Sequence, residues 1–269
     1  MAIGCTATMA GRGQGPVLIA LLTDPHTTRG TKDDQALYRG RFDEVIRQVN
    51  RARVNLVLIA GDLTQGGQAD EIADFKAEAA RFQAPTFWVP GNHDVGNKRL
   101  PGSAEVGVTA EKVAAYEAAL GPSFYAQTVA GIRVIGLNSS LFGSGLLREQ
   151  QMEEFLVAQI AQPSPLRTVV FMHYPPFLKS ADEKGGTYWN IEPAPRQRLL
   201  ATLQRGGVNI LLTGHLHYQL INHYNGMLIV TSAPVSFGIP RKEHAPEGWN
   251  LVTVPVKGEP SVEFNRVAE

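Results

Sequence analysis

Five short apolar runs in this chain each end at an aspartate, an asparagine or a histidine. The runs are rich in valine, isoleucine and leucine and are bounded by turn residues, which is typical of buried β-strands. They span residues 17–22, 54–60, 86–89, 168–172 and 208–212. The polar side chains that follow them are Asp24 with His26, Asp62, Asn92 with His93 and Asp94, His173, and His215 with His217. Functional groups collect beyond the carboxyl ends of strands in sheets with helical crossovers, so we expect these side chains to meet at one site.

Apolar residues at helical spacing occupy the gaps between these runs. The expected helices cover residues 42–49, 72–82, 152–160 and 199–203. Alternation of strands and helices predicts right-handed crossovers and parallel pairing. Two hairpins, at residues 124–137 and 218–231, and two strands within residues 250–264 add antiparallel pairs; Asn225-Gly226 favours a type I′ turn. We therefore predict an α/β fold, α+β by some schemes, with two mixed sheets packed as a sandwich between helices.

The length and charge of the chain restrict its organisation and its partners. The sequence has 269 residues, which we divide into a flexible, glycine-rich leader at residues 1–15 and a single domain at residues 16–269. Lys plus Arg equals Asp plus Glu, at 25 each, so no global field favours nucleic acid. No apolar stretch reaches the length of a membrane span. We expect a cytoplasmic protein, and the alternative is an extracytoplasmic protein with a trimmed signal peptide. Whether the chain forms a homodimer stays an open question.

The polar side chains at the strand ends suit a metal site. Residues two apart point to the same side of an extended chain, so Asp24 and His26 are expected to face one site together, as are His215 and His217. The Asn92 amide adds a neutral oxygen. Histidine, aspartate and asparagine without cysteine favour manganese, iron, zinc or cobalt over a structural zinc site. A lone histidine is more often a core or surface residue, but five such motifs together predict a two-metal hydrolase.

The ordered motifs Asp-x-His, Gly-Asp, Gly-Asn-His-Asp, His and Gly-His-x-His resemble those of the calcineurin-like metallophosphoesterases. The resemblance covers residues 17–217 and implies a four-layer αββα fold. It assigns Asp24, His26 and His217 to one metal ion and Asn92, His173 and His215 to a second. Asp62 would then bridge the two ions. His93 would lie beside the leaving group, and Asp94 would orient or support the turn that carries Asn92 and His93.

This resemblance implies direct hydrolysis at two divalent or trivalent metal ions. Manganese is our first expectation in vitro, with iron, zinc and cobalt as alternatives. Two ions close together lower the pKa of a bridging water, and the resulting hydroxide attacks phosphorus in line. The ions neutralise charge on the phosphoryl oxygens, and His93 donates a proton to the departing alkoxide.

Departures from known branches of the family narrow the choice of substrate. Gln65 stands where purple acid phosphatases carry a metal-binding tyrosine, and residues 63–67 lack the phosphate-gripping arginine of protein phosphatases. The chain is similar to the bacterial cyclic-nucleotide phosphodiesterases and to the small phosphoesterases of broad specificity related to them. Its segment at residues 187–190 also resembles small phosphatases related to the human calcineurin-like phosphoesterase-domain protein. We expect a phosphodiesterase on small organic or cyclic-nucleotide phosphates. A phosphomonoesterase, for small molecules or phosphoproteins, and a non-catalytic metal-binding scaffold are the alternatives, and a nuclease is disfavoured by the neutral charge.

Three long segments without periodicity, at residues 95–108, 174–195 and 233–248, are expected to form loops, the first two beside the site. Candidate substrate contacts within or near them are Tyr174, Trp189 and Asn138. Tyr188 and Trp189 would form an aromatic wall. Ordinary packing of Tyr174 and a simple turn at Asn138 are the alternatives.

Overall fold

The first of two β-sheets carries the strands that precede the Asp24, Asp62 and Asn92 motifs. The computed structural model describes residues 15–104, 107–163, 167–239 and 246–267. The strands of this sheet are β1 (Val17–Leu22), β2 (Leu56–Ala60), β3 (Thr86–Val89), β10 (Gly248–Val254) and β11 (Ser261–Arg266). Their order is β11-β10-β1-β2-β3; β1, β2 and β3 are parallel, and β10 pairs antiparallel with both of its neighbours.

The second sheet carries the strands that precede the histidine motifs. Its strands are β4 (Tyr125–Val129), β5 (Ile132–Gly136), β6 (Thr168–Phe171), β7 (Ile210–Thr213), β8 (Leu220–Tyr224) and β9 (Met227–Thr231). Their order is β4-β5-β6-β7-β9-β8, with parallel pairing from β5 to β9 and antiparallel strands at both edges. Both sheets are therefore mixed, as the sequence predicts.

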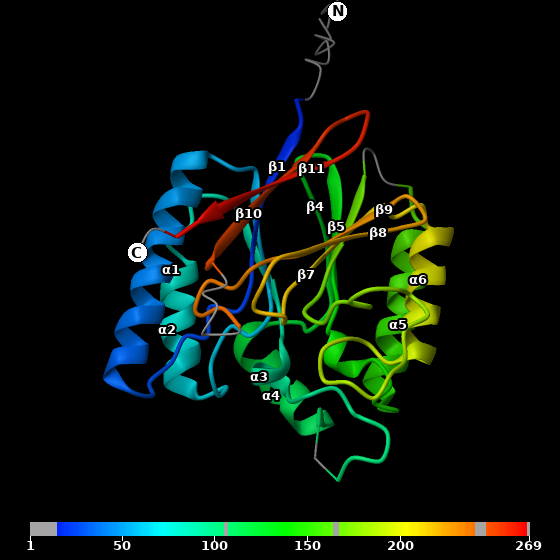
Figure 1. The fold of residues 1–269 in the computed structure, drawn as a ribbon, viewed down its shortest axis with the longest axis horizontal. Coiled ribbons are helices and arrows are strands. Elements are labelled where there is room, and N and C mark those ends of the chain that lie inside the picture. Colours follow the sequence, from blue (N-terminus) through cyan, green and yellow to red (C-terminus); the bar gives the residue numbers. More distant parts are fainter. Residues whose placement is uncertain (1–14, 105–106, 164–166, 240–245, 268–269) are drawn as a thin grey trace, which may run out of the picture.

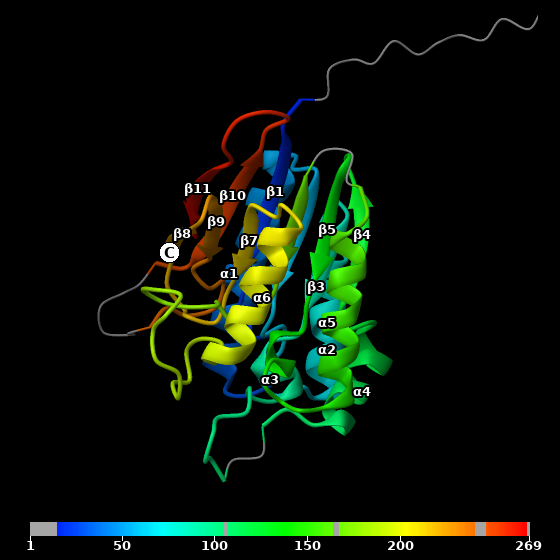
Figure 2. The same cartoon turned by 90° about the vertical axis from the view of Figure 1, so that its right-hand side faces the viewer.

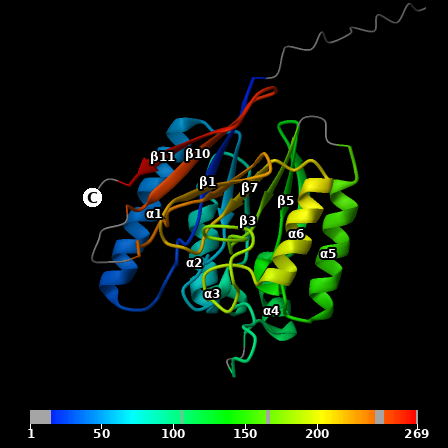
Figure 3. The same ribbon diagram turned by 45° about the vertical axis from the view of Figure 1, so that its right-hand side comes forward.

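Helices cover the outer faces of the two sheets. The helices are α1 (Lys32–Ala52), α2 (Ala69–Ala79), α3 (Asn92–Val95), α4 (Ala110–Leu120), α5 (Leu147–Ile160) and α6 (Pro193–Arg205), with a short 3₁₀ turn η1 (Ser139–Leu141). Figure 1 shows α1 and α2 on one side of the sheets and α5 and α6 on the other, with α3 and α4 at the lower end. Figure 2 looks from the side of α5 and α6, which stand in front of the strands, and Figure 3 again shows α1 and α2 on one side and α5 and α6 on the other. The predicted fold class and its four layers are confirmed.

The core between the sheets is made of side chains from alternate strand positions. Ile19 and Leu58 of the first sheet and Val134, Val169 and Leu212 of the second are all fully buried in one apolar cluster. The remaining faces of the strands pack against the helices. Because β1, β2, β6 and β7 are buried on both faces, they read in the sequence as continuous apolar runs without alternation.

Both predicted hairpins are present, and their turns have the same backbone geometry. Asn225 and Gly226 join β8 to β9 with φ angles of 47° and 81°, as a type I′ turn requires. Ala130 and Gly131 join β4 to β5 with φ angles of 49° and 82°. The asparagine turn was readable from the sequence, whereas alanine is an unusual residue at its position.

Two helices were not predicted. Helix α4 begins where the expected loop at residues 95–108 ends, with Thr109 as its N-cap and Val113, Tyr116 and Leu120 buried. The helical spacing of these three apolar residues indicates a helix, although the alanines between them weaken the apolar pattern. Helix α3 is a single turn that begins at Asn92, and its length is too short for periodicity to detect.

Three further expectations concern the leader, membrane spans and the extent of the domain. Of the leader expected at residues 1–15, residues 1–14 lie outside the described part of the chain, and Gly15 is exposed. None of the helices that the structure describes combines the length and the apolar character that a membrane span requires. The extent of the domain, residues 16–269, stays a prediction.

Candidate metal centre

The structure brings the predicted metal ligands together beyond the carboxyl ends of five strands. Two groups of ligand atoms each lie within 4.8 Å of one another. The first group comprises Asp24, His26, Asp62 and His217, and the second comprises Asp62, His173 and His215. All of these residues are buried. Asp62 belongs to both groups, so one carboxylate lies between two sets of histidine nitrogens.

In the first group, nitrogen and oxygen atoms lie at short distances from one another. His217 Nε2 lies 3.2 Å from Asp24 Oδ1 and 3.2 Å from His26 Nε2. His26 Nε2 lies 3.6 Å from Asp62 Oδ2 and 3.8 Å from Asp24 Oδ1. These separations are the edges of a small polyhedron of donor atoms around one point, which is the arrangement that a coordinated cation requires.

The second group has the same character, and Asn92 adds an oxygen atom to it. His173 Nε2 lies 3.3 Å from Asp62 Oδ2, 3.2 Å from His215 Nδ1 and 3.1 Å from Asn92 Oδ1. The amide oxygen of Asn92 therefore completes a second set of converging donors. Because Asp62 Oδ2 is near both His26 and His173, the two sets share one oxygen.

Backbone carbonyls hold the histidine rings in one orientation. His173 Nδ1 donates to the Ala60 carbonyl at 2.7 Å, His217 Nδ1 to the Phe237 carbonyl at 2.6 Å, and His215 Nε2 to the Tyr188 carbonyl at 3.2 Å. In a neutral ring, the nitrogen that donates to a carbonyl carries the single proton, and the other nitrogen has a lone pair that can bind a metal ion. In each ring the nitrogen so freed is the one that faces the group of ligands.

One carboxylate oxygen at the centre lacks any hydrogen-bond partner among the described residues. Asp24 Oδ2 accepts from Thr23 Oγ1 at 2.5 Å and from the His215 backbone N–H at 3.0 Å. Asp24 Oδ1 is buried and accepts from no donor when His217 carries its proton on Nδ1. Burial of an unpaired carboxylate oxygen is unfavourable unless a cation balances it. The orphaned oxygen and the thiol-free donor set therefore fit a pair of divalent metal ions.

The charge states of the acidic and histidine side chains suit metal binding. Burial acts to raise the pKa of Asp24, but the charges of His217 and His173 outweigh it and lower that pKa to about 2. The pKa of Asp62 is likewise well below its usual range because His173 overcomes the effect of burial. Burial lowers the pKa of His26 and of His215 to about 3, so both are neutral imidazoles at neutral pH.

Positive charge at the centre is shared between two other histidines. Burial alone would lower the pKa of His173, but the Asp62 and Asp24 carboxylates raise it to about 9. The pKa of His217 is raised in the same way, mainly by Asp24. Two buried carboxylates thus attract compensating positive charge, and a bound cation would displace the histidine protons.

Most of the predicted ligands adopt a strained backbone conformation. Among the described residues, eight other than glycine have a positive φ, and five of the eight are predicted ligands. These are Asp24 (52°), His26 (46°), Asp62 (50°), His215 (74°) and His217 (56°). Each such residue costs about 1–3 kcal/mol and persists only where its surroundings enforce it. The side chains therefore meet through left-handed turns, and the strand alternation that we assumed for the pairs 24/26 and 215/217 is wrong.

Asp94 joins the loops that carry Asp62 and Asn92. Its carboxylate accepts from the backbone N–H groups of Leu63 at 3.1 Å, Thr64 at 3.1 Å and Gly91 at 2.8 Å. Burial, together with the nearby Asp62 charge, raises the pKa of Asp94 to about 6. The carboxylate thus ties the turn after β2 to the start of α3.

His93 lies beside the first group of ligands. Its backbone N–H donates to Asp62 Oδ1 at 2.9 Å, and its ring meets the His26 ring edge-on with 4.6 Å between centroids. His93 Nδ1 donates to the Gln65 carbonyl at 2.7 Å. We had considered Gln65 only for its side chain, but its backbone oxygen is what orients the His93 ring and leaves Nε2 available.

Gly91 makes the approach of these two loops possible. A Cβ atom at this position would lie 2.1 Å from Asp62 Oδ1 and 2.2 Å from the Asp62 backbone nitrogen. No heavy atom can occupy that space without moving the Asp62 backbone. The close approach therefore depends on glycine for its lack of a side chain.

Substitution Gly91→Ala is expected to displace Asp62. We expect manganese affinity to fall by roughly tenfold or more, as when partners of metal ligands are lost, and stability to fall by about 2 kcal/mol through overpacking. Equilibrium dialysis and denaturant unfolding measure the two effects. Gly40→Ala is the matched control, because a Cβ at Gly40 in α1 meets nothing within 4 Å and should stabilise the helix by about 0.5–1 kcal/mol. Metal affinity equal to that of the wild type in Gly91→Ala would contradict the expectation.

The three predicted substrate contacts occupy different environments. Tyr174 is fully buried, with its ring centroid 4.1 Å from that of His215. Asn138 is also fully buried and caps η1 by accepting from the Ser140 N–H at 3.2 Å. Trp189 is 36% exposed, 5.8 Å from the His215 ring. Of the three, only Trp189 presents its side chain to solvent.

Tyr188 contacts the centre in a way that we did not predict. Its hydroxyl accepts from Asn92 Nδ2 at 3.0 Å, and its carbonyl accepts from His215. The sequence marked Tyr188 only as part of an aromatic wall, since a backbone carbonyl carries no residue-specific signal.

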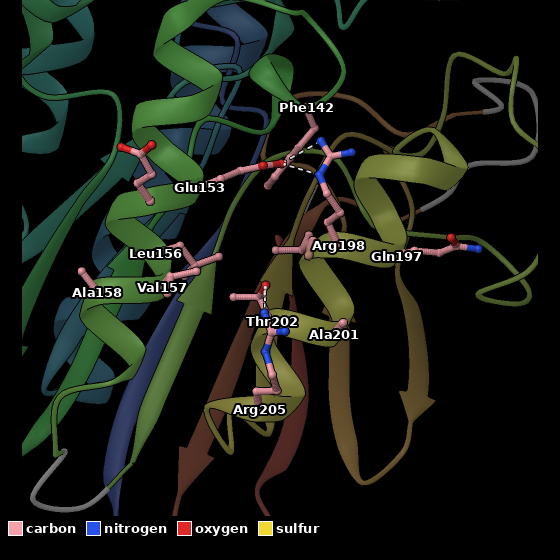
Figure 4. A pocket seen from close by; sticks show the side chains of 12 residues that line it. Phe142, Glu153, Leu156, Val157, Ala158, Gln197, Arg198, Ala201, Thr202 and Arg205 are labelled. Atoms are coloured by element: carbon pink, nitrogen blue, oxygen red, sulfur yellow. Dashed lines mark hydrogen bonds and ion pairs between the residues drawn. The ribbon is translucent and has the colours of Figure 1, made fainter.

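Of two cavities at the surface, one is lined by residues of the metal centre and the other is not. A cavity of about 280 Å³ opens beside Asn92 and His93. A groove of about 790 Å³ lies between α5 and α6, where Glu153 and Arg198 point at one another across it (Figure 4). Their ion pair spans 2.8 Å. No predicted metal-binding or catalytic residue lines the groove, so the smaller cavity is the one next to the chemistry.

Comparison with known proteins gives relatives over most of the chain. A sequence model described as calcineurin-like phosphoesterase matches residues 17–219, a span that contains every predicted metal ligand. A probable cyclic nucleotide phosphodiesterase of Rhodococcus erythropolis is 28% identical over 250 residues, covering 87% of this chain and 78% of that protein. The serine/threonine-protein phosphatase CPPED1 of Homo sapiens is 27% identical over 227 residues, covering 79% of this chain and 68% of that protein.

A solved structure shares the fold. The crystal structure of a dimetal phosphatase from Danio rerio matches with a TM-score of 0.65 at 14% identity, covering 95% of this chain and 98% of that one. Both sheets and the flanking helices are thus common to the two proteins.

Proposed function

This chain belongs to the calcineurin-like phosphoesterase family, whose members include phosphodiesterases and phosphatases, and we propose that it hydrolyses small organic phosphodiesters, cyclic nucleotides among them, at a dinuclear metal centre. The observation that carries the proposal is the pair of ligand groups that share Asp62. A single metal site would need only one such group. Two groups with one common carboxylate are the geometry of a bridged pair of cations.

In this proposal each predicted ligand keeps the role that the family resemblance implies. Asp24, His26 and His217 would hold one ion, Asn92, His173 and His215 would hold the other, and Asp62 would be shared by both. The distances within each group support the assignment. Asp94 supports the turn on which Asn92 and His93 lie, through its hydrogen bonds to the loop after β2.

The side chains and the metal ions have separate tasks. When bound, the ions lower the pKa of water and neutralise negative charge on the phosphoryl oxygens. His93 holds a proton on Nε2 and delivers it to the departing oxygen. The Gln65 carbonyl, 2.7 Å from His93 Nδ1, accepts a hydrogen bond from that nitrogen, which keeps its own proton when Nε2 gives one up. The buried carboxylates of Asp24 and Asp62 keep the centre anionic enough to retain two cations.

Similarity to the phosphodiesterase of Rhodococcus erythropolis over 87% of this chain favours a diester substrate. Similarity to CPPED1 favours the second candidate, a phosphomonoesterase. Proton donation by His93 serves both reactions, because each expels an alkoxide. A non-catalytic scaffold is the third candidate, in which the same residues would bind metal without turnover.

Removal of metal is expected to abolish activity. Protein stripped with EDTA should show no hydrolysis of bis(4-nitrophenyl) phosphate, and added Mn²⁺ should restore it as two ions bind per chain. Metal analysis and a colorimetric assay measure these results. Activity that survives complete removal of metal would refute the proposal.

A substrate panel distinguishes the three candidates. It compares kcat/KM for bis(4-nitrophenyl) phosphate, 3′,5′-cyclic AMP and 4-nitrophenyl phosphate, with two manganese ions bound. Higher values for the two diesters support the proposed function, and a higher value for the monoester supports the second candidate. Two bound ions without turnover of any of the three support the scaffold.

A further inference from the structure

The loop between β6 and α6 is held rigidly against the metal centre. Arg196 is fully buried, and its guanidinium donates to the carbonyls of Ile191 at 2.9 Å, Ala181 at 2.8 Å and Glu183 at 2.8 Å. Glu183 Oε1 accepts in turn from the Leu178 N–H at 2.7 Å. These bonds connect parts of the loop that are up to 15 residues apart in the sequence to the start of α6.

A buried ion pair fastens this loop to the segment that follows Asn92. Lys98 Nζ lies 2.6 Å from Glu192 Oε1, and both side chains are buried. Glu192 Oε2 also accepts from the Gly186 N–H at 2.9 Å, two residues before Tyr188. The Lys98 N–H donates to the Tyr174 hydroxyl at 3.4 Å. The loop and the chain after α3 therefore have fixed positions relative to each other.

Tyr188 stands at the point where this loop meets the second ligand group. Its hydroxyl oxygen accepts from Asn92 Nδ2 at 3.0 Å, and its carbonyl oxygen accepts from His215 Nε2 at 3.2 Å. Its ring lies 4.7 Å from the His215 ring. One residue thus contacts two different ligands, from α3 and from the turn after β7.

Each contact holds a ligand in the state that binds a metal ion. The Asn92 amide has an oxygen and a nitrogen at nearly equivalent positions, and only the oxygen binds a metal ion. With the hydrogen bond from Nδ2 to the Tyr188 hydroxyl, Oδ1 faces His173, which it approaches to 3.1 Å. The bond from His215 Nε2 to the Tyr188 carbonyl places the lone pair on Nδ1, the nitrogen that faces His173.

We propose that Tyr188 is a positioning residue for the metal ion held by Asn92, His173 and His215, acting through its hydroxyl on Asn92 and through its carbonyl on His215. The inference rests on the proposed function, because it takes these three residues as ligands. According to this proposal, Tyr188 increases the affinity of the centre for metal. The role expected from the sequence, an aromatic wall against the substrate, would instead act on KM.

The test compares Tyr188→Phe with Tyr224→Phe, which removes a hydroxyl from a half-buried tyrosine in β8. Equilibrium dialysis against Mn²⁺ measures both binding steps. Tyr188→Phe should weaken one step by roughly tenfold, the lower end for loss of a ligand's partner, since the carbonyl to His215 remains. The other step, and both steps in Tyr224→Phe, should keep wild-type affinity. Thermal unfolding in EDTA shows that each variant is folded.

A double-mutant cycle identifies the site affected. Asn92→Ala removes the amide that the hydroxyl orients, so adding Tyr188→Phe to Asn92→Ala should cause no further loss of affinity. The activity of Tyr188→Phe should return to the wild-type kcat at saturating Mn²⁺, with KM unchanged. A raised KM with wild-type metal affinity would overturn the proposal in favour of the aromatic wall, and an additive double mutant would overturn it as well.

The measurement of bound metal distinguishes failure of this inference from failure of the proposed function. If the wild type binds two ions but hydrolyses no ester, the proposed function fails while dialysis still decides the role of Tyr188. If the wild type binds fewer than two ions, there is no second site to position, and the inference fails with it.

Discussion

Asp62→Ala is expected to remove bound metal and turnover together. Asp62 is the one side chain shared by both ligand groups, with its Oδ2 atom 3.6 Å from His26 Nε2 and 3.3 Å from His173 Nε2. Loss of the shared carboxylate weakens the binding of both ions. The charge stabilisation that the ions provide, which is worth several kcal/mol, is lost with them. We expect kcat/KM to fall by roughly 10³-fold or more, since each 1.36 kcal/mol is a factor of about ten. Metal analysis after dialysis and an aryl diester assay measure both losses.

A matched control for this substitution is Asp43→Ala. Asp43 is half-exposed and pairs with Arg81 on the outer face of the first sheet, so its loss should change activity little. Retention of two ions in Asp62→Ala would show that this aspartate does not bridge them. The remaining ligands would then have to be reassigned between the two groups.

His93→Ala is expected to slow turnover while both metal ions stay bound. His93 belongs to neither ligand group, and its ring stands edge-on to His26 with Nδ1 held by the Gln65 carbonyl. General acid catalysis by such a side chain contributes about 10²–10⁴-fold. We expect kcat to fall by that amount for esters of alkyl alcohols. The fall should be smaller for esters of 4-nitrophenol, whose anion leaves without a proton.

The comparison across leaving groups decides the role of His93. His223→Ala is the control, because His223 is exposed on β8 and should show wild-type rates with every ester. Metal content that falls in His93→Ala as far as in Asp62→Ala would mean that His93 is a ligand. An equal loss of rate for good and poor leaving groups would exclude proton donation to the leaving oxygen.

Much of the fold was predictable because local chemistry agrees with it. The five apolar runs became β1, β2, β3, β6 and β7, and Asn225-Gly226 formed the type I′ turn that its residues favour. Helix α4 was missed, although Thr109 caps it and Val113, Tyr116 and Leu120 follow at helical spacing. The many alanines between them give a weak contrast between the buried and the exposed face.

The backbone at the metal centre was not predictable from residue type. Aspartate and histidine adopt a positive φ infrequently, and no pattern in the sequence marks Asp24, Asp62 or His215 for it. The left-handed turns are imposed by long-range contacts, such as the bond from the His26 N–H to the Asp62 carbonyl and that from the His215 N–H to Asp24 Oδ2. Strand alternation, which is a local rule, therefore failed at these positions.

The sequence alone determined which donor atoms are available and that they follow buried strands, because strand formation and side-chain chemistry are properties of short segments. The division of the donors into two groups around Asp62, which the family resemblance implies, is produced by the tertiary structure, since it depends on which strands are neighbours and how the two sheets face each other. Only the tertiary structure decided the contacts of Tyr188 with Asn92 and His215. Those contacts join residues 96 and 27 positions apart, and such distances in the chain are closed by packing and long-range hydrogen bonds rather than by any local preference.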